Sequence, residues 1–307
     1  MKFKTMSLAF NYCEGSGIEL GAAAHNPFGL ADCLNIAPSD GVSGMYPEDV
    51  KDYWFYAEHQ RELTGSEVAK VDRIGDFQQI GLEDNSTDYI ISSHVIEHSP
   101  NVLAAFIESD RVLRAGGVFF CIFPKRNAEP SDADRPLTTL EQMIQAHREG
   151  FTVESLSPWR AHLQVLSTHT MLQAVNYLNQ QKLGSWLIEC VEETDSKVGN
   201  GHTLVLRKVE GIAEAKWLDE TVFAEVFNQL VSDSKFEDAL FMIKVWLSFN
   251  FFDAEKLFLT ALLCQRLDMP HEGLEFLIQA LILDPLNERY LTDYQTLTGK
   301  PFQNPVV

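Results

Sequence analysis

The pattern of hydrophobic and polar positions is clearest over residues 88–126, where two apolar runs flank an amphipathic segment. Asp88–Ser92 is short and rich in isoleucine, which is typical of a strand buried on both faces. Over Val102–Leu113 the apolar residues recur at helical spacing and form one face. Val118–Phe123 is a second apolar run. Two strands joined through a helix are expected to be parallel, with a right-handed crossover.

The ends of that helix carry their own signals. Ser99 is a natural N-cap residue. Gly116-Gly117 is expected to end the helix, because glycine adopts the left-handed cap conformation at little steric cost. Ligands of open parallel sheets bind beyond the carboxyl ends of the strands, so we expect Ser92, Ser93 and His94 at the mouth of a site.

Further short strands are expected on both sides of this unit: Gly17–Gly21, Ala31–Ala37, Val71–Phe77, Ser185–Glu193 and His202–Val209. The last two flank a turn at Lys197–Gly201 and are expected to pair with each other. Together these runs predict an α/β fold with a doubly wound, mostly parallel sheet over residues 1–210.

From Asp219 onward the pattern is helical alone, which predicts a small all-α domain over residues 211–307. Ser234 and Glu237 are spaced as a capping box, and Leu267–Pro270 should separate two helices. Aligning Phe236–Leu247 with Pro270–Leu281 gives a period of 34, as in tetratricopeptide repeats. Two such units are too few to stand alone, so they should pack on the first domain, on a capping helix or on a second subunit. A plain helical extension is the alternative.

Composition excludes several classes of protein. The hydrophobic fraction of 45% and the charged fraction of 22% are those of ordinary globular proteins. There is no apolar run long enough for a membrane span, and the N-terminus lacks the pattern of a secretory signal. The net charge of −20 argues against nucleic acid as a partner, because phosphates require neutralising lysines and arginines.

The five cysteines are widely spaced and form no CxxC pair, so neither a disulfide framework nor a metal site is indicated. A reduced, cytoplasmic protein is the simplest interpretation.

The order of these elements, with Glu19-x-Gly21 after the first strand and SSHVIEH after the fourth, resembles the class I S-adenosylmethionine-dependent methyltransferases of the Methyltransf_11 type. The resemblance covers roughly residues 17–208 and implies a Rossmann-like methyltransferase fold with S-adenosyl-L-methionine as cofactor. It also implies cofactor-binding residues: Glu19, Gly21 and Ala22 for the methionine end, Asp76 and Phe77 for the adenine, and Ser93 and His94 beside the methyl group.

Two departures from the family pattern stand out. Ala23 and His25 occupy positions where the family's first motif usually has glycines. The second strand lacks the usual acid for the ribose hydroxyls, and Asn35 is the nearby residue that could supply one hydrogen bond.

Residues 125–161 form a loop-rich insert after the fifth strand, where an acceptor would bind. Asp132, Asp134 and Arg135 form an acidic cluster with a following arginine just before a predicted helix, and Asp134 and Arg135 are the candidate acceptor-binding residues. Such carboxylates often only favour a helix N-terminus. His162 is a further acceptor-binding candidate. His94, Asp134 and His169 are the candidate catalytic bases for a hydroxyl acceptor, although histidines near helix starts are more often local hydrogen-bonding residues.

These features predict an enzyme that methylates a hydroxyl of a sugar or other small molecule. The Asn/Asp-Pro-Pro-Tyr signature of N-methyltransferases is absent after the fourth strand. The alternative is a weak or inactive methyltransferase-fold scaffold that binds a protein partner, or a second copy of itself, through the helical tail. A nicotinamide dehydrogenase is disfavoured, because G-x-G-x-x-G does not follow the first strand.

Overall fold

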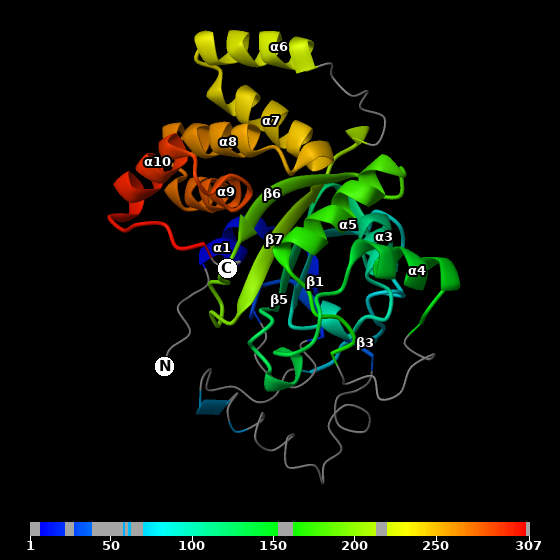
Figure 1. Ribbon diagram of the computed structural model, residues 1–307. Coiled ribbons are helices and arrows are strands. Elements are labelled where there is room, and N and C mark those ends of the chain that lie inside the picture. Colours follow the sequence, from blue (N-terminus) through cyan, green and yellow to red (C-terminus); the bar gives the residue numbers. More distant parts are fainter. Residues whose placement is uncertain are drawn as a thin grey trace. The chain divides into compact units, whose positions relative to one another are not determined.

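The computed structural model of the protein (Figure 1) describes residues 7–21, 28–38, 58, 61–62, 70–152, 162–212 and 220–304. The chain forms two compact units. The first comprises Met1–Ala174 and Glu193–Glu210, and the second comprises Val175–Glu192 and Gly211–Val307. Residues 175–192, which the sequence pattern assigns to the first domain, therefore group with the helical tail.

A seven-stranded sheet confirms the predicted α/β fold with its Rossmann-like strand order. The strands are β1 (Gly17–Leu20), β2 (Cys33–Ala37), β3 (Arg73–Ile74), β4 (Thr87–Ser93), β5 (Leu113–Pro124), β6 (Trp186–Glu192) and β7 (Gly201–Lys208). Their order is β3-β2-β1-β4-β5-β7-β6. The pairs from β3 to β5 are parallel, and β7 runs antiparallel to β5. Since β2 and β4 flank β1, the strand order reverses there, at the place where such sheets bind ligands.

The predicted strand–helix–strand unit is β4, α3 (Val102–Val112) and β5. Tyr89, Ile90 and Ile91 of β4 are fully buried, as the isoleucine-rich run predicts. Phe106 of α3 packs edge-to-face on Phe119 of β5, with ring centres 5.6 Å apart. This aromatic contact seats the helix on the sheet.

Both predicted ends of this helix are wrong. The N-cap is Asn101, whose side chain accepts a hydrogen bond from the Ala104 amide, and not Ser99. The helix also ends before the two glycines, because buried Leu113 is already extended and pairs with Thr87. Gly116 then has a φ of +82° inside the residues of β5.

The other helical elements of the first unit are α1 (Ser7–Tyr12), α4 (Leu140–Glu149) and the 3-10 turns η1 (Ile96–His98) and η2 (Pro130–Asp132), and α5 (Thr168–Gln180) continues into the second unit. The expected third strand is shorter than predicted, because only the exposed Arg73 and Ile74 pair with β2.

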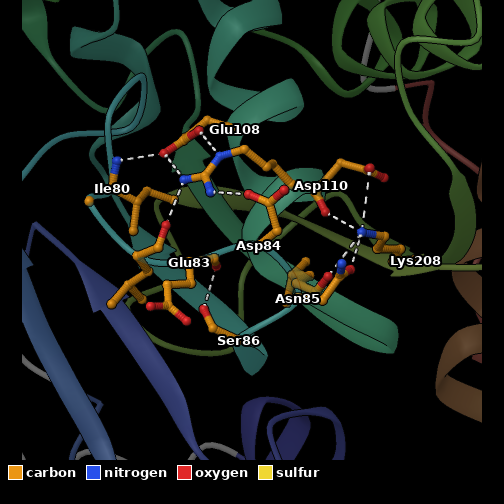
Figure 2. A network of polar contacts seen from close by, with 12 residues as sticks. Ile80, Glu83, Asp84, Asn85, Ser86, Glu108, Asp110 and Lys208 are labelled. Carbon is orange, nitrogen blue, oxygen red and sulfur yellow. Dashed lines mark hydrogen bonds and ion pairs between the residues drawn. The ribbon is translucent and has the colours of Figure 1, made fainter.

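The loop that leads into β4 is tied to α3 by charged hydrogen bonds (Figure 2). Arg111 donates to both carboxylate oxygens of Glu108, at 2.7 and 2.8 Å, to Asp84 at 2.6 Å and to the Leu82 carbonyl at 2.9 Å. Glu108 in turn accepts from the Ile80 amide at 2.9 Å. The same view shows Lys208 of β7 bonded to Asn85 and to the Asp110 carbonyl. These bonds hold the amino end of β4 between a helix and an antiparallel strand.

The second unit contains the helices α6 (Glu220–Ser232), α7 (Phe236–Asn250), α8 (Ala254–Arg266), α9 (Pro270–Leu283) and α10 (Glu288–Thr298). The predicted break at Leu267–Pro270 is confirmed. The predicted capping box at Ser234 is wrong, because α7 has Lys235 at its N-cap and no side-chain cap. Gly273 allows α8 and α9 to pack closely, since a Cβ there would lie 3.0 Å from the Ala261 carbonyl oxygen.

Buried polar bonds explain why residues 175–192 group with the tail. Asn179 of α5 donates to the Trp186 carbonyl at 2.7 Å and accepts from the Trp186 amide at 2.9 Å. The hydroxyl of Ser248 on α7 accepts from the Ile188 amide at 3.0 Å. On α9, His271 lies 2.5 Å from buried Glu192 of β6. The strand β6 therefore supplies partners to α5, α7 and α9.

All five cysteines are free, which agrees with the absence of a disulfide framework. None of the described helices is both long enough and apolar enough to cross a membrane.

Replacing Arg111 by alanine should lower the free energy of unfolding by about 1–3 kcal/mol, because several hydrogen bonds between charged groups are lost. Arg114→Ala is the matched control. Its ion pair with Asp88 is more exposed and should contribute less than about 1 kcal/mol. Denaturant unfolding of both variants tests this, and equal losses would contradict the role of the Arg111 network.

The His271–Glu192 pair should make stability depend on pH. The hydrogen bond to Glu192 raises the pKa of His271 above its ordinary value. Its stabilisation is therefore complete below the unfolded-state pKa of about 6.5 and is lost as the pH rises through the higher folded-state pKa. Between about pH 6 and pH 9, the thermal midpoint of the wild type should fall more than that of His271→Gln. His147→Gln, on α4, controls for the loss of an imidazole elsewhere, and a wild type that falls no more than His271→Gln would refute this.

Candidate functional site

The turn after β1 requires glycine for two reasons. Gly21 has a φ of +80°, and its amide donates to the Ile36 carbonyl at 2.8 Å. A Cβ at this position would lie 2.4 Å from Cγ2 of Val95, in the loop after β4. The backbone at the end of β1 is thus packed directly against the loop that follows β4.

Glu19 is buried in β1, two residues before this turn. Its two carboxylate oxygens accept from the Phe28 amide at 3.1 and 3.0 Å. Burial raises the pKa of Glu19, while the charge of Lys197 and the Phe28 amide act in the opposite direction. The first acidic residue of the predicted cofactor site is therefore held by a backbone donor, and the charge of Lys197 favours its ionised form.

Lys197 reaches this site from the turn between β6 and β7. It is buried, and its Nζ lies 3.7 Å from the centre of the Phe28 ring. Burial lowers the pKa of Lys197 to about 8, although the charges of Glu19 and Asp195 oppose the shift. Sequence reasoning placed Lys197 in a turn and missed its approach to Glu19, and no local sequence signal indicates it.

Asp195 builds the turn that carries Lys197. Its carboxylate accepts from four backbone amides at 2.6–3.0 Å: those of Lys197, Val198, Gly199 and Gly201. Burial acts to raise the pKa of Asp195, but these four donors outweigh it and lower the pKa. The turn is therefore ordered around an ionised carboxylate.

Asn35 lies opposite Glu19 in the parallel register of β1 and β2. Its Nδ2 donates to the Lys70 carbonyl at 2.9 Å, and its own amide donates to Asp72 at 3.0 Å. Its buried Oδ1 has no hydrogen-bond partner among the described residues. The amide group is thus oriented by the segment that leads to β3, with its acceptor oxygen unpaired.

Asp76 and Phe77 lie beyond the end of β3, and not inside it as the predicted strand Val71–Phe77 had them. Oδ1 of Asp76 accepts from the amides of Gln78 and Gln79, at 2.6 and 3.1 Å, and closes its own turn. Phe77 is buried and meets Phe119 edge-to-face, with ring centres 6.3 Å apart.

At the carboxyl end of β4, Ser93 is half-buried and His94 has a φ of +56°. The His94 amide donates to the Ile122 carbonyl of β5 at 2.9 Å, which holds this left-handed residue at the strand end. Burial lowers the pKa of His94, although the charge of Asp195 opposes the shift. The neutral imidazole is therefore favoured.

Glu97, three residues later, has a side chain with no exposed surface. Its Oε1 lies 3.8 Å from Nε2 of His98, 3.8 Å from Nε2 of His162 and 4.0 Å from Nδ1 of His94. Burial raises the pKa of Glu97 to about 8. Its carbonyl accepts from the amides of Leu163 and Gln164, which brings His162 to the end of β4.

Asp132 and Arg135 hold the other side of His162. Oδ2 of buried Asp132 lies 2.5 Å from Nδ1 of His162. Arg135 donates to Asp132 at 2.7 Å and to the carbonyls of His162 and Leu163 at 2.7 and 3.1 Å. The insert after β5 therefore contributes a carboxylate and a guanidinium group to the end of β4.

Of the candidate residues named from the sequence, the structure brings His94, His162 and Arg135 together. Asp134 is exposed, and the neighbouring Asp132 is the buried carboxylate. His169 is exposed in the first turn of α5. Ala22, Ala23 and His25 lie outside the described residues. Glu97 and His98 were not among the site residues predicted from the sequence, so the cluster that they form was missed.

Gly21→Ala should destabilise the protein by more than the roughly 1–2 kcal/mol that a left-handed conformation costs an alanine. The new Cβ would also displace Val95. Gly29→Ala is the control, because Gly29 has a φ of +69° and a Cβ there would meet nothing within 4 Å. Denaturant unfolding should show the larger loss for Gly21→Ala and partial recovery when Val95→Ala is added. Equal losses for the two glycines would disprove the contact.

Residues 55–121 match the family described as "Methyltransferase domain", which is less than half of the chain. The match implies S-adenosylmethionine as the cofactor. No curated protein matches the sequence.

Solved structures with a similar fold include S-adenosylmethionine-dependent methyltransferases of three organisms. The protein of Thermotoga maritima is 15% identical with a TM-score of 0.38, and the match covers 66% of this chain and 87% of that one. The proteins of Aquifex aeolicus and Methanosarcina mazei are 14% and 13% identical, with TM-scores of 0.36 and 0.37. These matches cover 67% and 66% of this chain and 90% and 97% of the others. At such identities the likeness concerns the fold alone.

Proposed function

We propose that the protein transfers a methyl group from S-adenosyl-L-methionine to a hydroxyl of a sugar or other small molecule. The observation that carries the proposal is the contact between the ends of β1 and β4. Gly21 of the first turn packs on Val95, directly after Ser93 and His94. Strand order reverses at β1, so this contact lies where open parallel sheets bind their ligands.

The cofactor would lie along the ends of β1, β2 and β3. Glu19, Gly21, Ala22 and Asn35 would hold its methionine and ribose parts, and Asp76 and Phe77 its adenine. Lys197 adds an ammonium group beside Glu19, which suits the cofactor's carboxylate. Ser93 and His94 would border the sulfonium.

When bound, S-adenosylmethionine supplies a methyl group that leaves sulfur as the acceptor oxygen attacks it in line. The protein then has to align the two reactants and exclude water. His94 is the best-placed base for the hydroxyl proton, because burial keeps its imidazole neutral at the end of β4. Arg135 and His162 would bind the acceptor. Asp134 and His169 are exposed, so a catalytic role for them requires an acceptor that reaches the surface.

The spacing of the helices in the tail supports a tetratricopeptide-like arrangement. Helices α7 and α9 begin 34 residues apart, at Phe236 and Pro270, and α8 and α10 begin 34 apart, at Ala254 and Glu288. Equal offsets for both helices of a pair are typical of such repeats. The tail would bind a protein partner or a second copy of the chain.

A scaffold that no longer binds cofactor is the second candidate. It is favoured by the contacts of Glu19, whose two oxygens accept from the Phe28 amide while Lys197 compensates its charge. In that case the Glu19–Lys197 pair would serve stability alone.

Calorimetric titration with S-adenosylmethionine and with its demethylated product separates the two candidates. The enzyme proposal predicts binding by the wild type and about tenfold or greater weakening in Glu19→Gln, because a charged partner of the cofactor is lost. Asp134→Asn, at an exposed carboxylate, is the matched control and should bind cofactor normally. Absence of binding at millimolar cofactor would refute the enzyme and favour the scaffold.

A further inference from the structure

We propose that Glu97, His98 and His162 form a binding site for a divalent transition-metal cation, with Zn²⁺ as the ion that best suits these ligands. One ligand atom from each residue can be chosen so that all three lie within 4.8 Å of one another. The absence of CxxC spacing in the sequence excludes a thiolate site but has no bearing on imidazole and carboxylate ligands.

The distances fit a single ion after small side-chain rotations. Zinc bonds to imidazole nitrogen and carboxylate oxygen are about 2.0–2.2 Å long, so tetrahedral ligands lie roughly 3.3–3.6 Å apart. Oε1 of Glu97 lies 3.8 Å from Nε2 of His98 and from Nε2 of His162. The two imidazole rings are adjacent and edge-to-face, with centres 4.9 Å apart. Each of these two Glu97 distances has to shorten by only a few tenths of an ångström, and the ligand atoms of all three residues lie within 4.8 Å of one another.

Glu97 is the second, independent indication of a ligand. Its side chain has no exposed surface, and neither carboxylate oxygen has a hydrogen-bond partner among the described residues. A buried carboxylate without hydrogen bonds is costly, so its charge requires a cation or a proton. Nε2 of His98 and Nε2 of His162 both lie 3.8 Å from Oε1, so a metal ion shared by these three residues is a direct solution.

His162 is oriented as a metal ligand. Asp132 lies 2.5 Å from its Nδ1, so Nδ1 carries the proton and the lone pair of Nε2 points to Glu97. A carboxylate behind the ligating imidazole is the arrangement that fixes metal-bound histidines in many proteins. Arg135 holds Asp132 and the His162 carbonyl in place. Asp132 and Arg135 are therefore positioning residues for the site.

The set of donor atoms favours a transition metal over Mg²⁺ or Ca²⁺, which prefer oxygen ligands. Two histidines and one glutamate leave a coordination position open, as in catalytic zinc sites. An acceptor's hydroxyl oxygen could occupy this position at the end of β4. That last step rests on the proposed function, whereas metal binding itself does not.

The test is metal binding by the chelator-treated, full-length protein, measured without cofactor or acceptor. Titration calorimetry should show one Zn²⁺ per chain, and Co²⁺ should bind with the visible absorption of a low-coordinate nitrogen–oxygen site. Glu97→Gln and His162→Ala should each abolish this binding. Asp132→Asn should weaken it by about 10–100-fold, and the Co²⁺ spectrum and the pH dependence of binding should shift. If Asp132 had only a structural role, neither the Co²⁺ spectrum nor the pH dependence of binding would shift.

His147→Ala, on α4 and outside the cluster, is the matched control and should bind Zn²⁺ like the wild type. Circular dichroism establishes that each variant is folded. A wild type that binds no more Zn²⁺ than His162→Ala would overturn the proposal and leave Glu97 as a buried protonated acid. Because cofactor is absent, a metal-binding protein that fails to bind S-adenosylmethionine would refute the proposed function and not the metal site.

Discussion

The parallel pairing of β4 with β1 on one side and β5 on the other is the constraint on which the site depends. It places Glu19 beside Ile91, and Ser93 beside Ile122, so the ends of three strands meet at one edge. Glu19, His94 and Glu97 lie on or directly after these strand ends. The apolar residues of β4 are fully buried, so a slip in register would expose them to water. The hydrophobic core thereby fixes the positions of the functional groups.

The sheet was predictable because most of its strands are short, uninterrupted runs of apolar residues. The helix ends were harder, because Ser99 and Asn101 are both good caps and only the entry of Leu113 into β5 shows where α3 must end. The positions of Glu19 and His94 in the fold were predictable, because Glu19 lies in β1 and His94 directly follows β4. Lys197 was not, because its importance depends on Glu19, which is distant in the chain.

The helical tail illustrates a different limit of sequence reasoning. Its helices and their period could be read from the sequence, but its partners in the second unit could not. Asn179 and Ser248 bond to the backbone of β6, at Trp186 and Ile188, and His271 pairs with Glu192. An asparagine in one amphipathic helix and a serine in another give no local sign that they share a strand. The second unit therefore begins inside α5, well before the change in composition at Asp219.

Two buried carboxylates, those of Asp195 and Glu97, differ in whether backbone amides compensate their charge. Asp195 accepts from four backbone amides, which compensate its charge and order the turn. Glu97 is equally inaccessible, and three imidazoles lie near it at distances too long for hydrogen bonds. Burial raises its pKa, its own backbone amide opposes the shift only in part, and the charges of Asp132 and Glu129 add to the rise. A fold gains little stability from a carboxylate placed in this way. A further positive charge nearby would compensate the carboxylate, which favours Glu97 over Asp195 as part of a site.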